Sequence, residues 1–284
     1  MPRVHRPARQ VEVVIVARVA LVFFGMVATT LPACRERAGR AARPDASVAP
    51  IVSASVASPP VAASSAPAPW QPARDAEVEL LEVPGDLPAF IVRGRPGGER
   101  MVFLHGLCGN PYAYAWSFRN AAARLGTIIA IQGNVPCSGE FRDWASTPDK
   151  VDARIQDAFR AAGDDRDLVD MIVVGYSSGA TYAELLVMKN PRRYSRAILI
   201  ANPRKPASFR LRGARAVVLM AGQRDRQDLM HAGLLDLKLA HVPATFMVLP
   251  GATHGEMGPE SERVMREALA WLLEHKRPAG DSRP

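Results

Sequence analysis

Residues 171–179 of the chain read MIVVGYSSG and lead into a segment of helical character that ends near Lys189. The run of β-branched and other apolar residues predicts a buried strand. The pentapeptide Gly175–Gly179 fits the pattern G-x-S-x-G, in which a serine occupies a strained turn between a strand and a helix. Glycine suits both ends of this pattern because a Cβ atom there would meet neighbouring backbone. The stretch therefore predicts a strand–turn–helix unit that holds the hydroxyl of Ser177 above the end of a sheet.

Strands and helices alternate on both sides of this unit. Further strands are expected at Met101–Leu104, Thr127–Ile131, Arg196–Ala201, Ala216–Ala221 and Thr245–Leu249. Helices are expected at Pro111–Leu125, Pro148–Ala162, 227–240 and 259–275. The alternation predicts one α/β domain over residues 76–277, with a mainly parallel sheet covered by helices on both faces. Two short opening strands, Glu77–Val83 and Ala89–Arg93, flank a Pro-Gly-Asp turn and predict an antiparallel pair at the sheet edge.

A serine hydroxyl is a weak nucleophile unless a base, oriented by a third group, removes its proton. Of the six histidines, His254 lies in a loop just after the last expected strand, so we expect it to be the base. Asp225 follows the strand Ala216–Ala221 and is expected to accept a hydrogen bond from Nδ1 of His254. Asp228, one helical turn later, is the alternative acid. His105 follows an earlier strand and is expected to fix its loop rather than to act as a second base.

The first 33 residues have the pattern of an export signal. Arginines flank an uncharged apolar run, Val19–Thr30, which is shorter than the about 20 residues that span a bilayer. The next four residues, Leu31-Pro32-Ala33-Cys34, resemble a bacterial lipobox, although Pro32 departs from the usual pattern. We expect Cys34 to become a lipid-modified N-terminus that anchors the exported protein to a membrane of the cell envelope. An ordinary cleaved signal and an uncleaved anchor are the alternatives.

Residues 34–75 are rich in Ala, Pro, Ser and Val and show neither helical nor strand periodicity. Such a composition buries too little apolar surface to fold, so the segment is expected to be a disordered tether. Residues 278–284 are expected to form a disordered tail. The net charge of the chain is +8, but four Arg and one Glu lie in the first 33 residues, which leaves +5 for the remainder. This mild excess, without basic motifs interleaved with aromatic residues, is no argument for nucleic-acid binding, and no nucleic-acid partner is expected.

These elements together resemble the α/β-hydrolase family over residues 76–275. The resemblance rests on a His-Gly loop after the third strand, the elbow at Ser177, Asp225 and His254, which follow their strands in the family's order. Many members of the family insert a lid before the acid-bearing strand. Here only residues 202–215 are available for it, which is too short for a cap domain and implies an open site.

The resemblance also implies a function. The backbone N–H groups of Leu107 and Ser178 would form an oxyanion hole. The chain would be a serine hydrolase that cleaves a small or polymeric carboxylic ester through an acyl-enzyme. A peptidase or amidase, an acyltransferase and a non-catalytic tethered binding protein are the alternatives. The sequence contains no metal-ligand spacing, P-loop or dinucleotide fingerprint, so neither a metal nor a cofactor is expected.

The chain has three cysteines, and a lipid on Cys34 leaves the pair Cys108 and Cys137. Both follow strands that the resemblance makes neighbours in the sheet. In an oxidising compartment we expect them to form a disulfide that braces the predicted oxyanion loop. Two free thiols are the alternative.

Overall fold

The computed structural model describes residues 75–275 of the 284-residue chain. The predicted export signal at 1–33, the tether apart from its last residue, Cys34 and the predicted tail at 278–284 lie outside the described residues. None of the helices within residues 75–275 is long and apolar enough to cross a membrane. Within the same range, no group of three or more His, Cys, Asp or Glu side chains is arranged to hold a metal ion.

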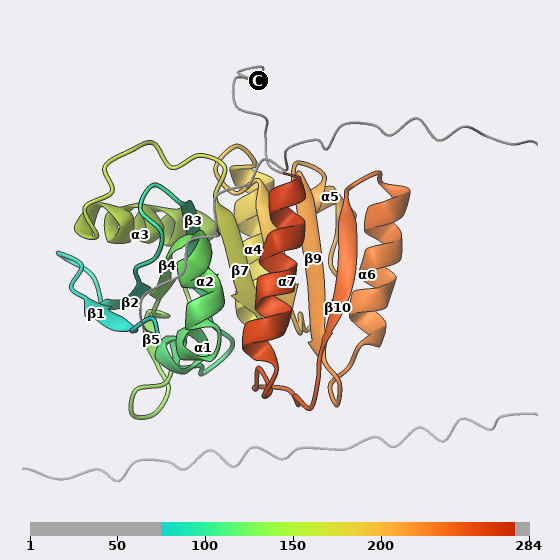
Figure 1. Cartoon of the computed structure of the whole chain (residues 1–284), viewed down its shortest axis with the longest axis horizontal. Coiled ribbons are helices and arrows are strands. Elements are labelled where there is room, and N and C mark those ends of the chain that lie inside the picture. Colours follow the sequence, from blue (N-terminus) through green and yellow to red (C-terminus); the bar gives the residue numbers. More distant parts are fainter. Residues whose placement is uncertain (1–74, 276–284) are drawn as a thin grey trace, which may run out of the picture. The chain divides into compact units, whose positions relative to one another are not determined.

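A sheet of eight strands runs through the described domain (Figure 1). In spatial order the strands are β1 (Glu79–Leu81), β2 (Ala89–Val92), β4 (Gly126–Ile131), β3 (Glu99–Leu104), β7 (Ile172–Tyr176), β8 (Arg196–Ile200), β9 (Ala216–Gly222) and β10 (Ala244–Leu249). Strand β2 pairs antiparallel with both β1 and β4, and all other neighbours are parallel. The predicted mainly parallel sheet with an antiparallel pair at its edge is therefore confirmed.

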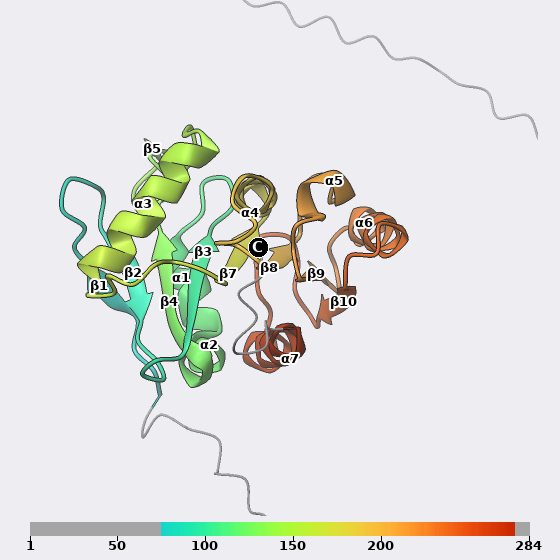
Figure 2. The ribbon, with the colours of Figure 1, turned by 90° about the horizontal axis from the view of Figure 1, so that it is seen from above.

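Helices cover both faces of this sheet (Figure 2). One face carries α3 (Pro148–Ala161), α4 (Ser178–Lys189), α5 (Ser208–Leu211) and α6 (Asp228–Leu239), and the other carries α1 (Pro111–Ser117), α2 (Arg119–Leu125) and α7 (Ser261–Glu274). Successive strand residues point to opposite faces, so Val102 and Leu104 join the first core whereas Met101 and Phe103 join the second. Burial on both faces explains why the central strands are continuous apolar runs.

The prediction of one helix over Pro111–Leu125 is wrong, because the chain breaks into α1 and α2 at Phe118. The ring of Phe118 is fully buried against that of Phe103, with 5.8 Å between their centroids. The carboxylate of Glu262, in α7, accepts hydrogen bonds of 2.9 and 2.7 Å from the N–H groups of the second and third residues of α2. These N–H groups have no acceptor within their own helix. A tertiary contact therefore caps the start of α2.

Two connections shape the end of the sheet where the predicted site lies. The segment between β8 and β9 contains only the short helix α5, so the described domain carries no cap at this position. A small hairpin of β5 (Val135–Pro136) and β6 (Arg142–Asp143), which the strand patterns did not predict, follows β4. The hairpin stands where the chain leaves the carboxyl end of β4.

Candidate active site

Ser177 lies at the sharp turn between β7 and α4, as the elbow pattern predicts. Its backbone has φ 51° and ψ −118°, a conformation that residues with a side chain rarely adopt. Its N–H donates a hydrogen bond of 2.8 Å to the carbonyl of Ile200 in β8. A Cβ atom on Gly175 would stand 2.4 Å from the carbonyl oxygen of Gly179, and one on Gly179 would stand 2.1 Å from that of Leu104. Both glycines are therefore required by the turn that presents Ser177.

The structure brings the three predicted residues together in one hydrogen-bonded chain. Nε2 of His254 lies 3.2 Å from Oγ of Ser177, and Nδ1 of His254 lies 2.8 Å from Oδ2 of Asp225. An ionised carboxylate can only accept, so Nδ1 carries the proton and Nε2 can accept from the serine hydroxyl. The side chain of Asp225 is 8% exposed, whereas that of His254 is 53% exposed. The carboxylate is therefore shielded from solvent while the imidazole is exposed to it.

Asp228, the alternative acid, lies elsewhere. Its carboxylate accepts a hydrogen bond of 3.0 Å from Arg226, and its side chain is 64% exposed. Asp225 is instead fixed by the loop after β9: its Oδ1 accepts from the N–H of Arg226 at 2.6 Å, and its own N–H donates to the carbonyl of Gly222 at 3.1 Å. Of the two carboxylates, Asp225 is the one that contacts the histidine.

Two tyrosines hold the loop that carries His254. The N–H of Gly255 donates to the hydroxyl of Tyr176 at 2.6 Å, and the hydroxyl of Tyr114 donates to the carbonyl of Gly255 at 3.1 Å. The two tyrosine rings are 4.8 Å apart between centroids, and that of Tyr176 is 5.8 Å from the imidazole. Burial raises the pKa of Tyr114 to about 12 and also raises the pKa of Tyr176, so both hydroxyls keep their protons. Tyr176 occupies a position that the elbow pattern leaves open, which is why the pattern gave it no role.

The two predicted oxyanion donors lie on the two segments that meet at the nucleophile. Ser178 is the first residue of α4, so its N–H has no acceptor within the helix. Leu107 follows Gly106, and a Cβ atom on Gly106 would stand 3.1 Å from Cβ of Ser177. No backbone hydrogen bond within residues 75–275 engages the N–H of Leu107. The N–H of Ser178, next to the nucleophile, and the N–H of Leu107, next to the glycine that packs against Ser177, thus have no backbone acceptor.

His105 is buried and binds the backbone with both ring nitrogens. Nδ1 donates to the carbonyl of Gly106 at 2.7 Å, and Nε2 accepts from the N–H of Gly133 at 2.8 Å. Trp144 donates from its indole to the carbonyl of His105 at 2.9 Å and lies against the imidazole. Burial lowers the pKa of His105 to about 4, so the ring is neutral at pH 7. The side chain fixes its loop and has no free nitrogen with which to act as a second base.

Cys108 and Cys137 form a disulfide, with 5.7 Å between their Cα atoms. Beside it, Gly109 and Arg142 exchange two backbone hydrogen bonds of 3.1 and 3.2 Å. The β5–β6 hairpin is therefore fastened to the loop of Leu107 by a covalent bond and by strand-like pairing. This hairpin was not predicted from the sequence, although the turn residues Ser138 and Gly139 are a local signal that could have indicated it.

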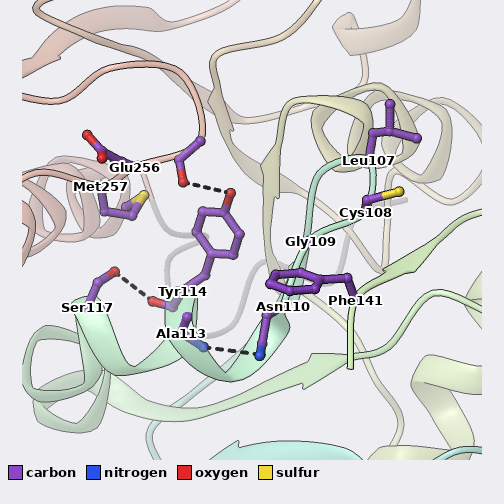
Figure 3. A pocket seen from close by; sticks show the side chains of 11 residues that line it. Leu107, Cys108, Gly109, Asn110, Ala113, Tyr114, Ser117, Phe141, Glu256 and Met257 are labelled. Carbon is purple, nitrogen blue, oxygen red and sulfur yellow. Dashed lines mark hydrogen bonds between the residues drawn. The ribbon is translucent and has the colours of Figure 1, made fainter. Parts of the chain in front are cut away.

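A cavity of about 460 Å³ opens beside these residues (Figure 3). It is lined by the loop of residues 107–110, by α1, by Phe141 of the hairpin and by the loop of residues 255–257. The cavity therefore lies between the loop of the predicted oxyanion donor Leu107 and the loop that follows His254.

No protein-family model matches the sequence, and no curated protein is similar to it in sequence. Solved structures are similar in fold. Naproxen esterase (carboxylesterase NP) from Bacillus subtilis has a TM-score of 0.51 at 12% identity, covering 68% of this chain and 91% of that one. A fungal esterase from Rhizomucor miehei has a TM-score of 0.51 at 16% identity, covering 70% and 83%. A thioesterase domain from the curacin biosynthetic pathway has a TM-score of 0.50 at 14% identity, covering 69% and 100%.

At these identities the likeness concerns the fold. The parallel sheet, the helices on both faces and the serine on the turn after β7 agree with it. The chain has the α/β-hydrolase fold, as the sequence predicted.

Proposed function

We propose that this protein is a serine hydrolase that cleaves carboxylic esters through an acyl-enzyme intermediate. Ser177 is the nucleophile, His254 the general base and acid, and Asp225 the residue that orients the imidazole. One observation carries the proposal: the three side chains form a continuous hydrogen-bonded chain that ends on a serine in a strained backbone conformation. The similarity in fold to esterases supports the choice of an ester bond.

In the proposed reaction, Nε2 of His254 takes the hydroxyl proton as Oγ of Ser177 attacks the ester carbonyl carbon. The N–H groups of Leu107 and Ser178 stabilise the oxyanion that develops. Asp225 stabilises the imidazolium through Nδ1–H. The imidazolium then gives its proton to the leaving alkoxide, and the acyl group stays on Ser177. A water molecule, deprotonated by His254, attacks this acyl-enzyme, and the imidazolium returns the proton to Oγ of Ser177 as the acyl–oxygen bond breaks and the carboxylic acid is released.

The same residues would serve other acyl transfers. An amidase needs a protonated amine as leaving group, and an acyltransferase needs an alcohol in place of water in the second half-reaction. The exposed imidazole and the absence of a cap within the described domain leave the acyl-enzyme open to water, which favours hydrolysis.

The test compares the full-length protein with Ser177→Ala on a panel of p-nitrophenyl esters and aminoacyl anilides. We expect ester hydrolysis to fall by about 10⁴-fold or more in the variant, and a fluorophosphonate probe to label the wild type at Ser177 alone. Ser208→Ala, in α5, is the matched control and should keep both activity and labelling. An unlabelled wild type would identify a non-catalytic protein, and faster turnover of anilides than of esters would make it an amidase.

The exported location belongs to the same proposal. A Cys34-linked lipid followed by the Ala/Pro/Ser-rich segment would hold the hydrolase domain at a membrane of the cell envelope, facing the compartment outside the cytoplasm. The predicted targeting pattern supports this location, and the Cys108–Cys137 disulfide is the kind of bond that persists there.

A further inference from the structure

The cavity between the loop of Leu107 and the loop after His254 is lined in part by polar groups that already have hydrogen-bond partners. Oδ1 of Asn110 accepts from the N–H groups of Tyr112 and Ala113 at the start of α1, at 2.9 and 3.4 Å. Ser117 donates to the carbonyl of Tyr114 at 2.7 Å, and Tyr114 donates to the loop after His254, as Figure 3 shows. A ligand in this cavity thus meets few polar atoms that still need a partner.

Apolar side chains form the rest of the wall. Leu107 and Phe141 stand at the cavity with 65% and 48% of their surfaces exposed, and Ala113 and Met257 line it from other segments. Exposed apolar side chains gathered at a concave site favour an apolar ligand, which removes them from water. The volume of about 460 Å³ lies within the range of about 300–1,000 Å³ that small-molecule sites occupy.

The charge that lines the cavity is negative. Glu256 lies on its wall, and its carboxylate accepts a hydrogen bond of 2.9 Å from the hydroxyl of Thr253. This contact orients the carboxylate without neutralising it. A second carboxylate would be repelled there, so the cavity suits an uncharged group rather than an anionic one.

Phe141 is held at this wall by hydrogen bonds and a disulfide that do not involve the proposed catalytic residues. It lies in the β5–β6 hairpin, where its N–H donates to the carbonyl of Ser138 and its carbonyl accepts from the N–H of Cys137, both at 3.0 Å. Cys137 is in turn bonded to Cys108 of the loop that carries Leu107. The aromatic ring is therefore held at a fixed distance from the loop of the predicted oxyanion donor.

We propose that this cavity binds an uncharged apolar chain or ring of the ester substrate, and that contact with the ring of Phe141 favours larger apolar groups over small ones. The inference rests on the proposed function, since it places the substrate of that same site. It makes Phe141 a specificity-determining residue, and it predicts esters of medium-sized apolar acids or alcohols as better substrates than acetates of small alcohols.

The experiment measures kcat/KM for wild type and Phe141→Ala on two series. The first series is p-nitrophenyl acetate, butyrate and octanoate, and the second is ethyl, benzyl and octyl acetate. We expect Phe141→Ala to lower kcat/KM about tenfold for the larger apolar group of one series, and to change the smallest member by no more than about twofold. The series that responds identifies the acyl or the alcohol side as the group in the cavity. Phe209→Ala removes another exposed ring, on α5, and should change neither series.

Two results would overturn the inference. The first is that Phe141→Ala lowers kcat/KM by the same factor for all members of both series. The second is that Phe141→Ala and Phe209→Ala give the same kcat/KM for every ester. A binding measurement separates this failure from failure of the proposed function. In Ser177→Ala, which cannot form the acyl-enzyme, calorimetry should show methyl octanoate bound more tightly than sodium octanoate, with the ester's affinity reduced by adding Phe141→Ala. If this pattern holds while the wild type hydrolyses no ester, the cavity assignment stands and the proposed function fails.

Discussion

Asp225 and Asp228 lie three positions apart, but their surroundings differ. The first carboxylate is buried against the imidazole of His254, and the second is exposed and paired with Arg226. Asp225→Asn keeps the shape of the side chain but presents an amide that cannot stabilise an imidazolium. We expect kcat to fall by about 10³–10⁴-fold in this variant. Asp228→Asn is the matched control, and the acid assignment would be wrong if it lost activity while Asp225→Asn kept it.

His105 gives the protein a pH-dependent stability. Its pKa is about 4 in the folded state against a usual 6.5, so between these values the unfolded chain binds the extra proton. The contribution of neutral His105 to the free energy of unfolding is therefore complete above pH 6.5 and is lost as pH falls toward 4, at about 1.4 kcal/mol per pH unit. We expect the destabilisation caused by His105→Gln to be about 2 kcal/mol smaller at pH 5 than at pH 7.5. Urea unfolding of wild type and variant at the two pH values measures this change. Equal destabilisation at both pH values would contradict the lowered pKa of His105.

Glu184 should give the opposite dependence of stability on pH. This buried carboxyl in α4 accepts hydrogen bonds from Asn202 at 2.6 Å and from Arg210 at 3.3 Å, and burial raises its pKa to about 7 from a usual 4.5. The folded state then holds the proton more tightly than the unfolded state. Stability from this group is lost as pH rises from 4.5 to 7. Relative to wild type, Glu184→Gln should gain stability over that interval in the same urea measurements, and a relative loss would show that Arg210 keeps the carboxyl ionised.

At the scale of elements, the β5–β6 hairpin depends on its two attachments to the loop of Leu107. Cys108→Ser with Cys137→Ser removes the covalent one and leaves the pairing between Gly109 and Arg142. Closure of a loop with a separation of 29 residues should contribute about 2–4 kcal/mol to the free energy of unfolding. We expect the double variant to melt at a lower temperature and to lose ester hydrolysis, and reductant to do the same to wild type. Non-reducing peptide mapping that finds both thiols free would refute the bridge but leave the proposed triad untouched.

The elements that sequence patterns predicted are those determined by residues close together in the sequence. The strands are continuous apolar runs, and the elbow at Ser177 needs its two glycines within five residues, so both were visible. The break at Phe118 was not visible, because the carboxylate that caps α2 comes from Glu262, more than 140 residues away. The hairpin was missed for a related reason, since its strands are only two residues long and are stabilised by the neighbouring loop.

The same distinction applies to the candidate site. Ser177, Asp225 and His254 could be predicted as candidates because each follows a recognisable strand. Tyr114 and Tyr176 were not assigned to the histidine loop, because their hydroxyls reach a glycine backbone that no spacing in the sequence identifies. Phe141 likewise lies in a polar loop, and only the folded chain shows that its ring faces a cavity.

At the scale of the whole molecule, the proposed lipid on Cys34 decides where the domain works. Two or more acyl chains anchor a protein stably, whereas one chain binds a membrane only marginally. We expect the wild type expressed in bacteria to sediment with membranes and Cys34→Ser to be released or to remain an unprocessed precursor. Cys108→Ser is the control for loss of a cysteine and should still sediment. Intact-mass analysis showing an unmodified N-terminus at another residue would contradict the anchor.

The carboxylate of Glu262 on the start of α2 also affects how the protein is made. The residues of α2 are synthesised early, but the carboxylate that caps them follows only when nearly the whole domain has been made. His254 and its neighbouring strand β10 are synthesised just before that capping residue. The newborn chain therefore lacks the carboxylate that caps α2 until its last helix is being made, and the proposed triad is incomplete until His254 has been added.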